Sequence, residues 1–201
     1  MASCQSILEE ENFTRLFLLL EKPCLKLMRA LFVRRLQETN PGISVDAFLH
    51  NNRVDLLRTR HGQNNRNKYF PIGTGTDLHT WDIAMLYNMT CFYVYIYKYT
   101  PERMKGLLNA IKRMRDKLCH RGNPCVSKNQ YDTYRQRVND FLEYGLNYLD
   151  DNILRNEIAD VAKIEQPMAR EFVEFHKRIH NVYQEDYSLR EVVEGKALFT
   201  D

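Results

Sequence analysis

Residues 100–122 read TPERMKGLLNAIKRMRDKLCHRG, and this stretch is the clearest guide to the fold. Thr100, Pro101 and Glu102 are typical of a helix start, because they combine a capping hydroxyl, a proline suited to the first turn and an early acid. Apolar residues then recur three and four positions apart, which places them on one helix face. They are Met104, Leu107, Leu108, Ile111, Met114 and Leu118. We expect this face to pack into a core and the helix to end at Gly122.

The same helical period continues toward the N-terminus. Residues 7–37 predict a long helix, which Pro23 should kink or split because proline cannot donate the internal hydrogen bond. Residues 40–42 predict a turn, and Ser44 is a good cap for a second helix. Residues 60–76 are rich in Asn, Gly and Pro, so we expect them to form the longest loop.

The pattern also continues toward the C-terminus. Thr76 or Asp77 is expected to cap a helix through residues 81–97, whose strand-like end has no second strand to pair with. Ser127 should cap the next helix, and residues 150–164 and 168–187 predict two more. The sequence therefore predicts an all-α bundle of about six helices in a single domain, residues 1–201.

Composition limits the class of protein. Of the 201 residues, 44% are hydrophobic and 27% charged, which is ordinary for a globular domain. The five cysteines are an odd number without a CxxC pair, which favours a reduced, cytoplasmic protein. The apolar stretches are too short or too polar for a bilayer span, and the acidic N-terminus does not resemble a signal peptide. We expect no membrane partner.

Charge is unevenly distributed along the chain. Residues 140–201 hold seven Lys/Arg against fourteen Asp/Glu, a net charge of −7. Because the whole chain has a net charge of +3, residues 1–139 have a net charge of +10. A basic body suits a polyanionic partner such as RNA. Complementary packing between the two parts of the chain is the alternative.

Residues 112–121 concentrate the groups that could perform chemistry. On a helix, residues four positions apart lie in one stripe, and one such stripe contains a lysine, an aspartate and a histidine, so the aspartate can orient the imidazole. Its members are Lys112, Asp116 and His120, and a second stripe of like charge consists of Arg113, Lys117 and Arg121. Arg115 points about 140° away from His120 on an ideal helix. Both can reach one ligand only if the helix end unwinds, or if Arg115 of one chain faces His120 of another.

At these residues the chain resembles a known family. The HEPN superfamily has a signature late in a helix, which consists of Arg, then Asn, His or Asp, then any three residues, then His. Arg115, Asp116 and His120 match this signature. The blocks at residues 12–16, 31–32, 69–71 and 81–86 add to the likeness. Over residues 10–150 the chain resembles the HEPN domain of DAZ-interacting zinc-finger ubiquitin ligases and their invertebrate relatives. Residues 151–201 would then be additional C-terminal helices.

The resemblance implies a HEPN-like helical bundle within a longer chain, and a metal-independent endoribonuclease. Cleavage by the RNA 2′-hydroxyl needs a base, an acid and positive charge on the phosphorane. His120 would be the acid/base, Arg115 would stabilise the phosphorane and Asp116 would orient His120. Phosphates would be held by Lys112, Arg113, Lys117 and Arg121. Two motifs across a homodimer would complete a site for single-stranded RNA with no metal or cofactor.

Two other functions stay open. One is a non-catalytic HEPN module that dimerises, binds a nucleotide or acts as an adaptor in a signalling or innate-immunity protein. This branch often has Asn where the chain has Asp116, which could pair with Arg115 or Lys112 instead of orienting His120. The other is a purely structural bundle whose basic stripe is covered by the acidic C-terminal helices.

Several further patterns are more simply interpreted as ordinary structure. His176 and His180 are four apart but lack a third metal ligand, so a surface helix is expected. Cys119 and Cys125 near His120 would need a fourth zinc ligand, for which His61 is the best choice. Cys119 beside His120 has poor geometry for a nucleophile. The tyrosines of residues 87–99 could stack bases, although partial burial is expected.

Overall fold

The computed structural model describes residues 4–91, 100–120 and 124–162, which form helices and turns with no strand among them. The predicted all-α bundle is therefore confirmed. The predicted break at Pro23 is also confirmed, because a π-helical turn at this residue separates two α-helices. They are α1 (Cys4–Leu19), the turn Leu20–Cys24 and α2 (Leu25–Thr39). Proline removes one backbone donor, so regular α-helical hydrogen bonding cannot pass through it.

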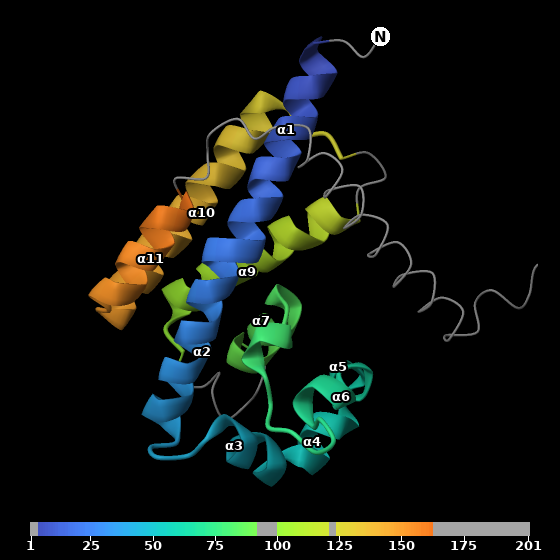
Figure 1. Cartoon of the computed structure of the whole chain (residues 1–201), viewed down its shortest axis with the longest axis vertical. Coiled ribbons are helices and arrows are strands. Elements are labelled where there is room, and N and C mark those ends of the chain that lie inside the picture. The colour runs from blue at the N-terminus through green and yellow to red at the C-terminus, as the bar shows by residue number, and fades with distance from the viewer. Residues whose placement is uncertain (1–3, 92–99, 121–123, 163–201) are drawn as a thin grey trace, which may run out of the picture.

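Four more helices pack around this rod. They are α7 (Ile83–Cys91), α9 (Glu102–Cys119), α10 (Lys128–Leu149) and α11 (Asn152–Ala162). Figure 1 shows α10 running alongside α1 and α2, while α9 crosses the rod. Helix α7 packs against both α2 and α9. This arrangement brings Asp82, at the N-terminal end of α7, next to Arg115 in the C-terminal half of α9.

The apolar faces predicted from sequence form the core. On α9 the expected stripe is buried, with Leu107 partly so. Trp81 is 1% exposed and packs on Phe32 and Tyr69, with ring centroids 5.4 and 5.0 Å away. Helix α10 approaches α2 so closely that a Cβ at Gly145 would lie 2.7 Å from the side chain of Leu27. This contact requires the absence of a side chain at residue 145.

The prediction for residues 45–76 is wrong in part. Ser44 caps a helix as expected, accepting a hydrogen bond from the Ala47 N–H at 3.1 Å. That helix is short, and residues 60–69, predicted to be loop, are mostly helical. The segment consists of α3 (Val45–Asn51), α4 (Arg53–Arg58), α5 (Arg60–Asn64) and α6 (Arg66–Tyr69). Thr59 caps α5, and a Cβ at Gly62 would overlap the Leu56 carbonyl, so the glycine permits a close turn.

Two predicted helix caps are also wrong. Asp77 caps only the 3₁₀ turn Leu78–Thr80, and the α-helix begins after Asp82. At α9, the Thr100 hydroxyl donates to the Thr90 carbonyl at 3.3 Å, and Pro101 takes the cap position. In both cases the capping group expected from the local sequence is used by another contact.

The C-terminal ends of the predicted helices are only partly described. Helix α9 ends at Cys119, with His120 as its cap, rather than at Gly122. Helix α11 begins at Asn152 and is described to Ala162. The predictions for residues 93–97 and 168–187, and the placement of Arg121, lie outside the described residues. Within the described helices, none combines the length and the apolar composition that crossing a bilayer requires.

Candidate functional site

Helix α9 presents three of the predicted site residues on its outer face. Arg113, Lys117 and His120 are all exposed. Seven residues span nearly two turns of a helix, so Arg113 and His120 lie along the same face, with Lys117 between them. Within the described part of the chain, neither Arg113 nor Lys117 forms an ion pair. We call these three residues the basic face of α9.

Arg115 points in the other direction. Its side chain is only 13% exposed, and its Nη2 lies 3.4 Å from Oδ2 of Asp82. Its Nη1 lies 3.4 Å from Oδ1 of Asp116. The structure therefore separates Arg115 from the basic face, as the 140° offset from His120 predicts. The two motif residues do not converge on one point of the same helix.

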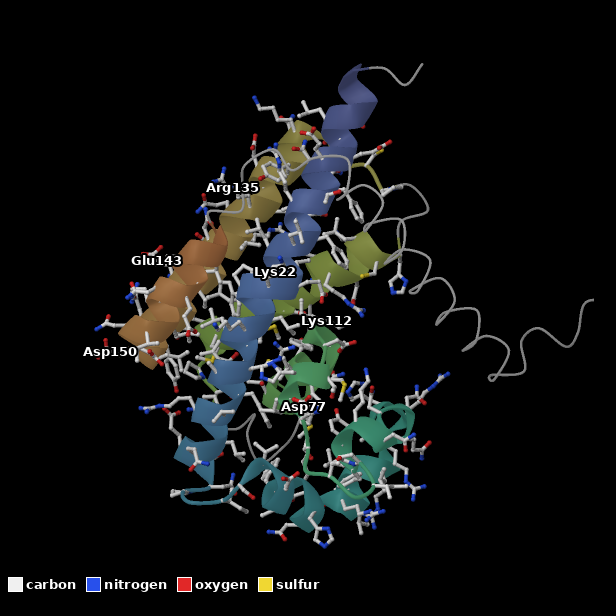
Figure 2. The ribbon with its side chains drawn as sticks, in the orientation of Figure 1. Lys22, Asp77, Lys112, Arg135, Glu143 and Asp150 are labelled. Atoms are coloured by element: carbon white, nitrogen blue, oxygen red, sulfur yellow. The ribbon has the colours of Figure 1, made fainter. Side chains whose placement is uncertain are left out.

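Asp116 also contacts Lys112. The Lys112 Nζ lies 2.7 Å from Oδ2 of Asp116, one turn away, and 6.0 Å from the ring centroid of Tyr87. Figure 2 shows Lys112 where α9 passes α7. Within the described residues, the carboxylate of Asp116 thus contacts Lys112 and Arg115, the alternative that the sequence left open. Its role in orienting His120 stays a prediction.

Asp82 is a site residue that sequence reasoning missed. Its Oδ1 accepts a hydrogen bond from the Met85 N–H at 2.8 Å, while its Oδ2 faces Arg115. One carboxylate therefore caps α7 and pairs with α9. Arg29 of α2 anchors the preceding segment by donating to the Leu78 carbonyl at 2.8 Å. An acid three residues before a buried methionine was the available signal, since Asp is a preferred N-cap.

Glu21 is the second residue that sequence reasoning missed. It lies in the π-helical turn, and burial raises the pKa of its carboxyl above the usual value. The positive charge of Arg115 opposes this rise in pKa, and the negative charge of Asp82 adds to it. Arg115 therefore compensates acidic groups from the rod, from α7 and from its own helix. An acid inside an apolar run beside Pro23 was the only hint of this position.

His120 occupies the C-terminal end of α9. Its backbone N–H donates to the Asp116 carbonyl at 3.0 Å, and its side chain is exposed. Exposure and location therefore suit a group that exchanges protons with a bound molecule.

The geometry does not favour a thiol nucleophile or a zinc site at these residues. Cys119 is buried, and burial raises the pKa of its thiol to about 11, so the reactive thiolate is scarce at neutral pH. The Nε2 of His61 lies 2.9 Å from the Tyr69 hydroxyl, and its Nδ1 lies 3.1 Å from the Asn88 amide nitrogen. Among the described residues, no three His, Cys, Asp or Glu side chains gather as metal ligands do.

The chain matches no protein-family model, no curated protein and no solved structure. Any functional assignment therefore depends on the residues and geometry of α9 and its neighbours. A surface hollow of about 600 Å³ lies between α3 and the segment after α6. Its lining includes His50, Arg53, Phe70 and Ile72 but no residue of α9.

Proposed function

We propose that this chain is a HEPN-type domain that cleaves single-stranded RNA without a metal ion and acts as a homodimer in the cytoplasm. The observation that carries the proposal is the exposed basic face of α9, where His120 lies in line with Arg113 and Lys117. Two cationic side chains can bind successive phosphates while the imidazole, at the end of the row, reaches the next ribose along the strand. The HEPN signature at Arg115 and His120 supports the same chemistry.

The reaction needs two proton-transfer groups. One His120 would remove the proton of the 2′-hydroxyl, whose oxygen attacks the adjacent phosphorus. The His120 of a second copy would protonate the departing 5′-oxygen, so the products would carry a 2′,3′-cyclic phosphate and a 5′-hydroxyl. A homodimer supplies both histidines, because each chain has one such motif.

The position of Arg115 favours a second candidate function. Arg115 contacts Asp82 and Asp116 inside the fold, so its charge is already compensated. If this arrangement persists when RNA binds, the domain would hold RNA on its basic face without cutting it. A non-catalytic RNA-binding and dimerisation module is therefore the alternative proposal.

Cleavage of labelled single-stranded RNA in EDTA separates these two functions. His120→Ala should slow cleavage by about 10²–10⁴-fold, the usual effect of removing a general acid or base. His79→Ala is the matched control, because His79 is also exposed and belongs to a different segment. Wild-type protein that binds RNA but leaves it intact would support the non-catalytic module. Equal cleavage by wild type and His120→Ala would refute the catalytic assignment.

A further inference from the structure

The contact between Asp82 and Arg115 has a consequence for RNA binding, and the inference from it rests on the proposed function. We infer that Asp82 is a positioning residue that keeps Arg115 from binding phosphate, so Arg115 engages RNA only after exchanging this carboxylate for a phosphodiester. The basic face would make the first contact. Arg115 would add its contact in a second step.

The geometry of the pair suits an exchange. Asp82 uses one oxygen to cap α7, so only its Oδ2 is directed to Arg115. The contact joins one nitrogen to one oxygen at 3.4 Å, whereas strong charge-assisted pairs have separations of about 2.7–2.9 Å and are often bidentate. A phosphate can accept two hydrogen bonds from a guanidinium. Such a ligand can therefore replace Asp82 without disturbing the cap on α7.

Electrostatics explains why the pair lowers affinity for phosphate. The Arg115 guanidinium has Asp82 on one side and Asp116 on the other, and it interacts with the charge of Glu21. Lys112 offsets the charge of Asp116. The Asp82 charge lies next to the place where a phosphate would bind Arg115, and like charges at such distances repel strongly in a half-buried site.

Asp82→Asn separates the charge of Asp82 from its capping role. Asparagine is a good N-cap, so the hydrogen bond from the Met85 N–H can persist. Loss of the charge should make Arg115 available and add one phosphate contact. We expect about tenfold tighter RNA binding, the usual scale for one charged hydrogen bond. The slope of log affinity against log salt should steepen by about 0.7, the value for one more phosphate on a single strand.

The experiment measures fluorescence anisotropy of a labelled 2′-O-methyl RNA, which binds but cannot be cleaved by its own 2′-hydroxyl. Asp55→Asn is the matched control, because it also adds one unit of charge and removes the partner of an arginine, the exposed Arg58 at 3.1 Å. The steeper salt slope should occur with Asp82→Asn and not with Asp55→Asn. Adding Arg115→Gln to Asp82→Asn should abolish the gain. An equal slope and affinity in the two Asn variants would overturn the inference.

A second probe, inorganic pyrophosphate, separates the inference from the proposed function. Calorimetric titration should show pyrophosphate binding to Asp82→Asn that wild type lacks and that Arg115→Gln removes. If this occurs while wild type fails to bind RNA, the role of Asp82 in keeping Arg115 from phosphate stands and the proposed function fails. If wild type binds RNA but Asp82→Asn gains neither RNA affinity nor pyrophosphate binding, the inference alone fails. Asp82→Ser, which keeps a capping oxygen, replaces Asp82→Asn if that variant does not fold.

Discussion

Arg115→Ala should destabilise the fold as well as alter the site. The Arg115 side chain is 13% exposed, and its partners Asp82 and Asp116 are 33% and 28% exposed. Breaking a fully buried ion pair costs about 3–5 kcal/mol, whereas an exposed pair contributes less than about 1 kcal/mol. These half-buried contacts lie between the limits, so we expect the free energy of unfolding to fall by about 2 kcal/mol at neutral pH.

The loss should depend on pH in a defined direction. Burial already raises the pKa of Glu21 above 4.5, and removing Arg115 takes away the charge that opposes this rise. At pH values between 4.5 and the raised pKa of Glu21, the folded state binds more protons than the unfolded state. Stability therefore increases as the pH falls through this range. This pH range is wider in Arg115→Ala, because the pKa of Glu21 rises further when Arg115 is absent. The stability deficit of Arg115→Ala relative to wild type should therefore shrink as the pH falls.

Urea unfolding of wild type and Arg115→Ala at about pH 7.5 and about pH 5.5 tests this reasoning. Arg113→Ala is the control, because Arg113 is exposed on the same helix and its loss should change stability by less than about 0.5 kcal/mol. The reasoning is refuted if Arg115→Ala is as stable as Arg113→Ala. It is also refuted if the deficit of Arg115→Ala grows in acid.

Three further predictions concern binding, packing and assembly. Reversing Arg113 and Lys117 to Glu should weaken RNA binding, and the slope of log affinity against log salt, measured by anisotropy, should become shallower by about 1.4. Arg137→Glu on α10 is the control and should change this slope little. Gly145→Ala should lower the free energy of unfolding by about 1–3 kcal/mol, because the added methyl group overpacks against α2. Gly106→Ala has open space at its Cβ and should raise the free energy of unfolding by up to about 1 kcal/mol, and urea titrations measure both effects. Light scattering at micromolar concentration should report a dimer, and a strict monomer would contradict the composite site.

Much of the fold followed from local pattern. The apolar stripe of α9, the break at Pro23 and the Ser44 cap depend on residues within a few positions of one another. The sequence predicts a loop at residues 60–69 because Asn and Gly signal turns, whereas the short helices there depend on the close approach at Gly62. Such an approach is a property of the packed chain and leaves no period in the sequence.

The candidate site was predictable only on its own helix. The pairing of Lys112 with Asp116 follows from their spacing of four residues. The contact of Arg115 with Asp82 joins residues 33 positions apart, and it depends on where α7 packs against α9. The sequence therefore identified the exposed groups and the possible pairing of Asp116 with Arg115, but missed Asp82 and Glu21, the acidic groups that other elements bring to Arg115.

The proposed function requires this chain to cleave RNA through His120 without a metal ion. Analysis of the RNA ends formed in EDTA tests this requirement, with wild type and His120→Ala purified in the same way. Wild type should produce 2′,3′-cyclic phosphate ends on RNA and leave 2′-O-methyl RNA intact, because the 2′-hydroxyl is the nucleophile. Folded His120→Ala should produce at least about 100-fold fewer such ends. Wild type that forms no cyclic phosphate, or His120→Ala that forms as much, would refute the proposed function.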